Sequence, residues 1–270
     1  MRLSRFTRFA LATLAALVVT FLFAPLLVII LFAFGRSNVQ TFPIRHWSTY
    51  WFSVAWHDPA VRSALWLSIK AGVLATLIAL ILGTLVAFGI HRFNFFGRNT
   101  VSLLLVLPIA LPGIVTGLAL QSAFNLAGIP FSVYTIIIGH ATVCIVVVFN
   151  NVIARLRRTS MSLIEASADL GARPVQTFRL VTLPMLSTAI IAGALLAFAL
   201  SFDEVIVTTF TAGAQNTLPL WIFGAIRLGQ QLPEVNAVVV GVLILTVVPI
   251  VYAARLSSGE SLGISTSSNV

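Results

Sequence analysis

The chain has 270 residues, of which 59% are hydrophobic and 9% charged, and its mean hydropathy is +1.06. Soluble domains carry about 25% charged residues, so the composition excludes a water-soluble fold and predicts an integral membrane protein. The net charge of +9 is spread over short segments beside apolar runs, where it acts as a topology signal rather than a nucleic-acid patch. The single cysteine excludes an intramolecular disulfide.

The first predicted span begins directly after an arginine-rich N-terminus. Arg2, Arg5 and Arg8 precede an apolar run from Phe9 to Phe34. The apolar region of a secretory signal peptide has only about 7–15 residues, followed by a small-residue cleavage site. We therefore predict that this run is an uncleaved membrane span.

Six apolar stretches are long enough to cross a bilayer, which takes about 20 residues of helix. They are residues 9–34, 64–90, 101–127, 132–154, 184–209 and 235–254. Helices are expected because lipid offers the backbone no hydrogen-bond partners, and the runs are too long and uniform for barrel strands. The prediction is an all-α membrane protein with six transmembrane helices in one domain, residues 1–256, and a Ser-rich, disordered tail, residues 257–270.

The distribution of basic residues predicts that both termini are cytoplasmic. With the N-terminus inside, eleven fall in cytoplasmic segments: Arg2, Arg5, Arg8, Arg92, Arg98, Arg155, Arg157, Arg158, Arg173, Arg179 and Arg255. Five fall on the opposite side: Arg36, Arg45, Arg62, Lys70 and Arg227. An excess of arginine and lysine marks the cytoplasmic side of a membrane protein.

The first outer segment, residues 35–63, carries Trp47, Tyr50, Trp51 and Trp56. These aromatic residues suit an interfacial belt or an amphipathic helix at the membrane surface. A surface for a soluble partner is the alternative.

The third span contains residues that interrupt helices. Pro108, Pro112, Gly113 and Gly117 would permit a broken or bent helix, which suits a gate. Ordinary packing of membrane helices, in which Gly and Pro are frequent, explains them equally well.

Four further residues of the third and fourth spans carry polar or thiol side chains. Gln121 and Asn125 would line a pathway or hydrogen-bond between helices. His140 and Cys144 share one face of the fourth span. Two ligands do not make a metal site, so we expect packing with a hydrogen bond and no metal.

The most ordered polar segment lies in the predicted cytoplasmic loop, residues 155–183. Ser162 and Glu165 have the spacing of a capping box, and Gly171 suits the left-handed residue that ends a helix. The pattern predicts a helix over 163–170, which is too short to be stable unless it packs against something. This segment is therefore predicted to dock on a partner.

Two prolines follow in the same region. Pro174 fits the first turn of a second helix. Pro184 is expected to distort the entry to the fifth span.

The stretch from Glu165 to Pro184, which begins E-A-S-A-D-L-G and ends L-P, resembles the EAA loop of ABC-importer permeases. Ser167 and Val181 are mild departures from that pattern. The resemblance implies the type I ABC-importer permease fold, with a short helix seated in a cleft of the ATP-hydrolysing subunit. The coupling contacts that it implies are Leu163, Ile164, Glu165, Ala166, Asp169, Leu170 and Gly171.

Asp203 and Glu204 lie in the outer half of the fifth span. Carboxylates inside a membrane are costly unless they face protein or water, which makes the pair a functional-site hypothesis. Adjacent residues of a helix point about 100° apart, so at most one faces a pathway or gate squarely. The alternative is a pair that is solvated at the outer headgroup boundary.

The run S-F-D-E-V-I-V-T-T-F-T-A-G is similar to the second permease subunit of putrescine/spermidine importers. The similarity extends over Leu107–Leu120 and Gly139–Arg155 and covers most of spans two to six. It implies a polyamine substrate, whose positive charges would pair with a pathway carboxylate. The alternative substrate is 4-aminobutyrate or another amino-acid-like solute.

The chain is not expected to be an enzyme. Its only lysine, Lys70, lies in S-I-K-A-G, whereas a P-loop needs Gly-Lys followed by Ser or Thr. ATP and magnesium would be used by partner subunits. The resemblance implies two ATP-binding subunits, a second permease and a periplasmic solute-binding protein, in a bacterial inner membrane and without nucleic acid.

Two other classes of protein would require features that are not visible in the sequence. A stand-alone secondary carrier predicts an internal repeat and a coupling-ion site. An intramembrane enzyme needs a nucleophile with a base, or a metal cluster, inside the spans.

Overall fold

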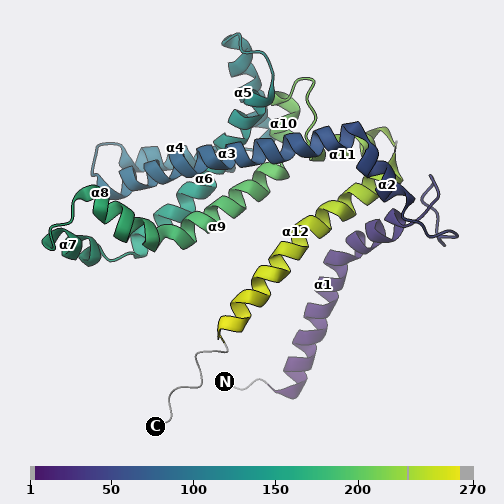
Figure 1. Ribbon diagram of the computed structural model, residues 1–270, viewed down its shortest axis with the longest axis horizontal. Coiled ribbons are helices and arrows are strands. Elements are labelled where there is room, and N and C mark those ends of the chain that lie inside the picture. The colour runs from purple at the N-terminus through teal and green to yellow at the C-terminus, as the bar shows by residue number, and fades with distance from the viewer. Residues whose placement is uncertain (1–3, 230, 262–270) are drawn as a thin grey trace. The chain divides into compact units, whose positions relative to one another are not determined.

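A computed structural model describes residues 4–229 and 231–261 (Figure 1). In chain order its elements are α1 (Arg5–Ala33), α2 (Tyr50–His57), α3 (Pro59–Arg92), α4 (Arg98–Ala110), α5 (Gly113–Leu126), α6 (Val133–Arg158), α7 (Met161–Asp169), α8 (Pro174–Thr177), the π-helical turn η1 (Phe178–Thr182), α9 (Leu183–Phe202), α10 (Ile206–Thr211), α11 (Leu218–Leu228) and α12 (Leu232–Ser261). Within these ranges the β structure is one isolated antiparallel bridge, between Gly35 and Trp47. The prediction of an all-helical fold is confirmed.

Four helices of the described chain are long and apolar enough to cross a membrane: α1, α3, α6 and the run Pro174–Phe202. The pair α4 and α5 would make a fifth span, bent by 105°. The predicted sixth span, residues 235–254, lies in α12, where the stretch Leu232–Thr246 is a shorter apolar helix. The count of six therefore stays a prediction.

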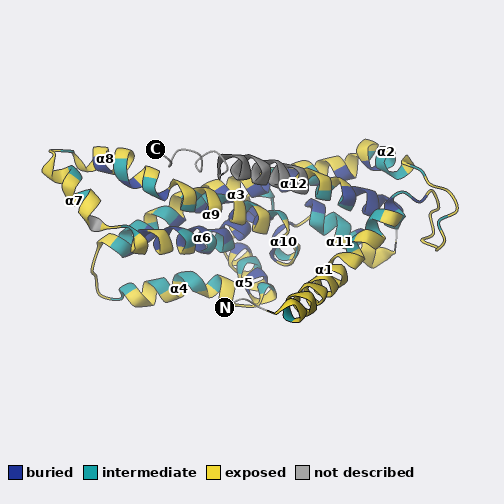
Figure 2. Cartoon of the chain, turned by 90° about the horizontal axis from the view of Figure 1, so that it is seen from below, coloured by how far each residue is buried: buried dark blue, intermediate teal, exposed yellow. Residues whose placement is uncertain are grey.

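The described residues of 4–62 and 224–261 form one compact unit, in which α1 and α2 each pack against α12 (Figure 1). The side chains of α1 are exposed almost throughout, and Ala33 is its buried residue (Figure 2). A helix that is apolar on every side belongs in lipid or against another chain. Helix α12 continues to Ser261, past the predicted start of the tail, whose remaining residues 262–270 lie outside the described residues.

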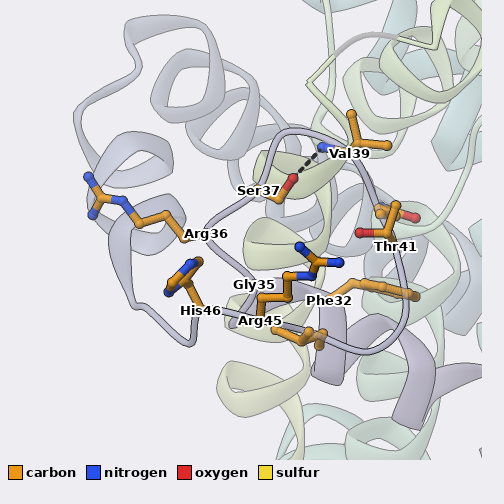
Figure 3. Close-up of a pocket in the computed structure, with 10 residues that line it drawn as sticks. Phe32, Gly35, Arg36, Ser37, Val39, Thr41, Arg45 and His46 are labelled. Atoms are coloured by element: carbon orange, nitrogen blue, oxygen red, sulfur yellow. Dashed lines mark hydrogen bonds between the residues drawn. The ribbon is translucent and has the colours of Figure 1, made fainter.

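The loop between α1 and α2 folds back on itself in the same unit. The Arg36 N–H donates to the His46 carbonyl at 3.0 Å, and the Ser48 N–H donates to the Phe34 carbonyl at 2.7 Å. The loop encloses a pocket of about 360 Å³ lined by Phe32, Gly35, Arg36, Ser37, Val39, Gln40, Thr41, Ile44, Arg45 and His46 (Figure 3). Since its lining holds two arginines and no carboxylate, the pocket does not suit a cationic solute.

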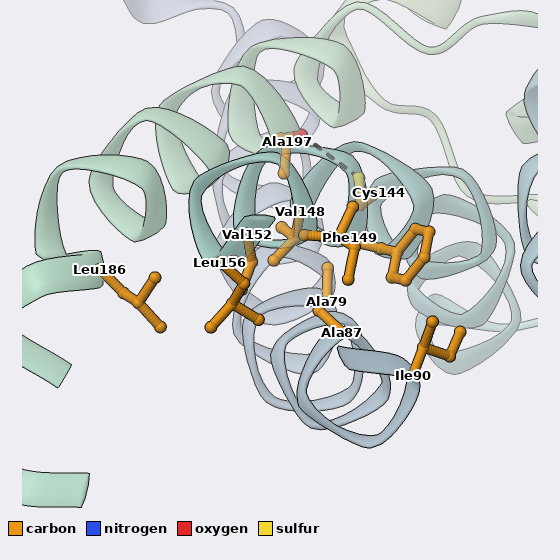
Figure 4. Close-up of a cluster of buried hydrophobic side chains, with 11 residues drawn as sticks. Ala79, Ala87, Ile90, Cys144, Val148, Phe149, Val152, Leu156, Leu186 and Ala197 are labelled. Atoms are coloured by element: carbon orange, nitrogen blue, oxygen red, sulfur yellow. Dashed lines mark hydrogen bonds between the residues drawn. The ribbon is translucent and has the colours of Figure 1, made fainter. Parts of the chain in front are cut away.

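Residues 63–223 form the second compact unit, and α6 is its centre. Of the most apolar stretch of α6, 61% is buried inside the chain, against 33% for α3 and 17% for Pro174–Phe202. Helix α6 packs against α9, α10 and α4. Its buried side chains join those of α3 and α9 in a hydrophobic cluster of Ala79, Ala87, Ile90, Cys144, Val148, Phe149, Val152, Ile153, Leu156, Leu186 and Ala197 (Figure 4).

A row of small residues runs along the buried face of α3. Ala71, Ala75, Ala79 and Ala87 are completely buried, and Gly83 lies in the same row of every fourth residue. Residues four apart share one face of a helix. Small side chains on that face let the backbones of two membrane helices approach closely.

Gly83→Ala is expected to destabilise the fold, and Gly89→Ala is its matched control in the same helix. A Cβ on Gly83 would lie 2.9 Å from the Ile145 carbonyl oxygen and 3.1 Å from the Phe149 nitrogen, whereas one on Gly89 meets nothing within 4 Å. Overpacking typically costs about 1–3 kcal/mol, while alanine in an open helix position gains about 1 kcal/mol over glycine. Thermal unfolding in detergent should show a lower midpoint for Gly83→Ala only; a midpoint equal to that of Gly89→Ala would contradict the close packing.

Candidate functional site

The stretch predicted as the fifth span, residues 184–209, holds two helices with a break at the carboxylate pair. Helix α9 ends at Phe202 and α10 begins at Ile206. The break has a local cause, because a Glu204 carboxylate oxygen accepts a hydrogen bond from the Val207 N–H at 3.0 Å. The first N–H groups of a helix lack partners inside the helix, and an acidic side chain satisfies them.

The two carboxylates of the break therefore have different surroundings. Glu204 is half-buried, caps α10 with its side chain, and accepts the Thr208 hydroxyl on its carbonyl oxygen. Asp203 is exposed, and its carboxylate has no hydrogen-bond or ion-pair partner among the described residues. Glu204 is thus engaged in holding the backbone, and the Asp203 carboxylate is not engaged by any described residue.

Helix α5 packs along α10 through two glycines four residues apart. A Cβ on Gly113 would lie 3.5 Å from Ile206, and one on Gly117 would lie 3.1 Å from the Cγ of Phe210. This is the small-residue spacing that brings membrane helices together. The start of α5, which follows the bend between α4 and α5, therefore lies level with the start of α10.

The predicted pathway residues Gln121 and Asn125 lie farther along α5. Gln121 is half-buried and Asn125 is exposed. Because Gly117 faces Phe210 near the end of α10, Gln121 lies one turn beyond that end. The structure does not bring these two amides to Asp203.

The three prolines proposed to break helices occupy different positions. Pro108 lies inside α4, and Pro112 is the residue before α5, at the 105° bend. Pro184 is the second residue of α9 and lies two positions after the end of η1, where the Leu183 N–H donates to the Phe178 carbonyl. Pro184 has no N–H with which to continue the regular hydrogen bonds of the α-helix. The π-helical turn lies where this series of hydrogen bonds is interrupted.

His140 joins α6 to both sides of the break. Its Nδ1 lies 2.7 Å from the Ser201 hydroxyl and its Nε2 lies 2.8 Å from the Thr208 hydroxyl. Cys144, on the same face, donates its thiol to the Ala197 carbonyl at 3.2 Å. Ser201 and Thr208 were not predicted as site residues, because they lie 61 and 68 positions from His140 and leave no local pattern.

Helix α7 occupies the predicted docking segment, with a different start. Its N-cap is Ser160, whose hydroxyl accepts the Ser162 N–H at 3.2 Å, so the predicted capping box of Ser162 with Glu165 is wrong. Two serines two positions apart both fit the pattern, and the helix begins one residue before Ser162. At the other end Gly171 has φ +79° and its N–H donates to the Ala168 carbonyl at 2.9 Å, as a left-handed helix end requires.

The side chains of α7 divide into an outer and an inner face. Leu163 is 50% exposed and Leu170 is 89% exposed, and Ala166 lies between them on the same face. Glu165 and Asp169 are also exposed, whereas Ile164 is half-buried. A short helix that presents leucines outward, with no cover from the described residues, has the surface of a docking element.

The inner face of α7 is tied to the helices that follow. The Ser167 hydroxyl lies 2.8 Å from the Thr177 hydroxyl of α8 and donates to the Ile164 carbonyl at 2.9 Å. The ring of Phe178, the first residue of η1, packs edge-on against Phe88 of α3 with centroids 5.4 Å apart. The docking segment is thus linked through α8 and η1 to the start of α9.

The helices, the interrupted spans and the outward-facing docking segment define a membrane permease. Residues 79–256 match the family described as binding-protein-dependent transport system inner membrane component. The chain belongs to this family. Permeases of ABC importers work with an ATPase, a second permease and a binding protein.

Two curated relatives lie within the same group of permeases. The putrescine transport system permease protein PotI of Escherichia coli (strain K12) is 38% identical over 226 residues, which cover 81% of this chain and 80% of that protein. The spermidine/putrescine transport system permease protein PotC of the same strain is 30% identical over 248 residues, covering 90% of this chain and 92% of that protein. The chain is therefore a permease of an ABC importer and not an enzyme.

Two solved structures share the fold. One is a bacterial ABC transporter involved in the import of the acidic polysaccharide alginate, with a TM-score of 0.69 and 16% identity, covering 96% of this chain and 99% of that chain. The other is the MetNI methionine ABC transporter in inward-facing conformations, with a TM-score of 0.60 and 18% identity, covering 74% and 95%.

Proposed function

We propose that this permease forms half of the translocation pathway for a polyamine such as putrescine or spermidine. The observation that carries the proposal is the 38% identity to the putrescine permease PotI over 81% of the chain. The free Asp203 carboxylate supports it, since a polyamine is a di- or trication at neutral pH and pairs with a carboxylate by charge.

Within the pathway, Asp203 is the residue that contacts the cation, and Glu204 shapes the backbone beside it. Asp203 is exposed at the break between the end of α9 at Phe202 and the start of α10 at Ile206. Gln121 and Asn125 would line the pathway beyond α10, where amide groups offer hydrogen bonds but no charge. The bend at Pro112 lies level with the break and suits a gate.

The coupling surface on the ATPase subunit is the outer face of α7 with its C-terminal turn. Leucine and alanine side chains supply apolar contact there, and an exposed ion pair contributes little. The residues proposed to make the contacts are Leu163, Ile164, Glu165, Ala166, Asp169, Leu170 and Gly171.

We place this face in the cytoplasm, with six spans and both termini on that side. Arginines from separate segments gather near one end of α3, since Arg92, Arg98 and Arg157 all lie close enough to His91 to act on its charge. An excess of arginine at one end supports a cytoplasmic assignment for it. The assembly proposed around the chain has two ATP-binding subunits, a second permease and a solute-binding protein, in a bacterial inner membrane.

Uptake of labelled putrescine, measured in cells with and without this chain while the other subunits are kept, tests the substrate. Unlabelled spermidine, 4-aminobutyrate and a neutral amino acid serve as competitors. Loss of uptake without the chain and competition by spermidine alone would support the polyamine assignment. Competition by 4-aminobutyrate would move the assignment to amino-acid-like solutes, and uptake indifferent to the chain would refute both.

Ser167→Ala is expected to reduce the solute imported per ATP hydrolysed roughly fivefold, because a hydrogen bond is worth about 1 kcal/mol and this one links α7 to α8. Ser187→Ala is the control, since within the part of the chain that the structure describes the Ser187 hydroxyl bonds only the Pro184 carbonyl of its own helix. The measurement is solute imported per ATP hydrolysed in reconstituted vesicles. An unchanged ratio for Ser167→Ala would show that the link carries no coupling.

A further inference from the structure

The buried imidazole of His140 spans the break in the fifth predicted span. His140 is 2% exposed and belongs to α6, whereas its two hydroxyl partners belong to other helices. Ser201 is in the last turn of α9, before the break, and Thr208 is in α10, after it. Both partners are also buried, at 3% and 0% exposed.

The protons of this cluster can be assigned from its acceptors. The Thr208 hydroxyl donates to the Glu204 carbonyl, so its one proton is used there. The contact with Nε2 then requires the ring to donate, which places the ring proton on Nε2. In the neutral ring Nδ1 is left as an acceptor, and the Ser201 hydroxyl donates to it. Each group of the cluster thus has one consistent role.

The cluster also reaches the residues of the break itself. Thr208 bonds the backbone of Glu204, and the Glu204 N–H donates to the Ser201 carbonyl at 3.4 Å. Helix α10 has only six residues, too few to hold a position without external contacts. Its far end is anchored separately, by the Thr135 hydroxyl on the Thr211 carbonyl at 2.7 Å. The end beside Asp203 is held by the Glu204 carboxylate and, from another helix, by His140.

We infer that His140 is a positioning residue for transport, which sets the place of the Asp203 carboxylate by holding Ser201 and Thr208 on either side of it. The inference rests on the proposed function, in which Asp203 contacts the cationic solute. Because no side chain holds Asp203 among the described residues, its position is set by the backbone, and His140 holds that backbone from both directions.

The test uses Thr208→Val, which removes the hydroxyl at nearly constant volume, and Thr208→Ser, which keeps it. Thr209→Val is the matched control, because Thr209 is exposed and its hydroxyl bonds, among the described residues, only the Val205 carbonyl of its own turn. Labelled putrescine uptake is measured in cells that contain the whole importer, with the amount of chain in the membrane determined for each variant. Thr208→Val removes two hydrogen bonds, one to the Glu204 carbonyl and one from His140. We expect KM to rise at least roughly fivefold for Thr208→Val, since one hydrogen bond alone is worth about 1 kcal/mol, and to stay unchanged for Thr208→Ser and Thr209→Val.

A double-mutant cycle separates positioning from a general loss of structure. If His140 acts through Asp203, Thr208→Val should have almost no further effect on KM once Asp203→Asn is present. The same fivefold rise in both backgrounds would overturn the inference while leaving the role of Asp203 intact. No effect of Asp203→Asn alone would refute the proposed solute contact, and the inference with it. Ser201→Ala, taken through the same cycle, gives a second route to either result should Thr208→Val lower the amount of chain.

Discussion

Gly171→Val is expected to reduce ATP-driven uptake about tenfold or more while leaving the chain in the membrane. Gly171 has φ +79°, a conformation in which a β-branched residue is strongly disfavoured. The left-handed backbone costs roughly 1–2 kcal/mol for an L-residue, enough to undo the bonds that end α7. The outer face of α7 would then lose its fixed direction toward the ATPase. The measurement is solute uptake alongside the amount of ATPase that co-purifies with the chain.

Gly97→Val is the matched control for this prediction. Gly97 has φ +84° and, like Gly171, has nothing within 4 Å of the position of a Cβ. It therefore carries the same strain in a loop that bears none of the proposed coupling residues. Equal losses from both substitutions, or normal uptake by Gly171→Val, would contradict the coupling role of α7.

Asp203→Asn is expected to raise KM for putrescine roughly tenfold or more, with little change in the amount of chain. A hydrogen bond to a charged group is worth about 1.5–3 kcal/mol, and the exposed Asp203 side chain has no structural partner to lose among the described residues. The measurement is the concentration dependence of labelled putrescine uptake.

Glu204→Gln removes the neighbouring charge and serves as the comparison. The amide oxygen of glutamine can still accept the Val207 N–H, so the start of α10 is kept. We expect a KM close to that of the parent chain. Equal increases in KM from the two substitutions would mean that binding of the solute depends only on the total charge at the break. Asp203 would then make no specific contact with the solute.

Length and uniform hydropathy were enough to predict the long helices. The predicted spans 64–90 and 132–154 correspond to α3, Pro59–Arg92, and α6, Val133–Arg158, with differences only at the ends. Hydropathy says little about the apolar stretches that change direction, because a bent helix and a straight one bury the same residues in lipid. Proline and glycine marked the region of the α4–α5 bend but not its angle of 105°.

The candidate site was predicted in its composition rather than in its arrangement. The carboxylate pair and the docking segment stand out locally, because charge is rare in an apolar chain. The different tasks of Asp203 and Glu204 depend on a backbone break, and the hydrogen bonds that bridge this break come from His140, more than sixty positions away. Such long-range hydrogen bonds leave no periodic signal in one sequence. The sequence also could not tell that Ser160 rather than Ser162 is the N-cap of α7, because both serines fit the capping pattern.

The close approach of α3 and α6 at Gly83 has a consequence for how the permease moves. A glycine whose added Cβ would meet backbone atoms leaves no room for the helices to slide, so the pair should behave as one rigid body. Movement is then left to the hinge at Leu111–Pro112, where the helical hydrogen bonds are interrupted, whereas His140 ties together the two sides of the break at Asp203. Since this hinge lies level with the start of α10, a turn at Leu111–Pro112 would move the helix that packs beside Asp203. Opening and closing of the pathway at the carboxylate would then come from one hinge.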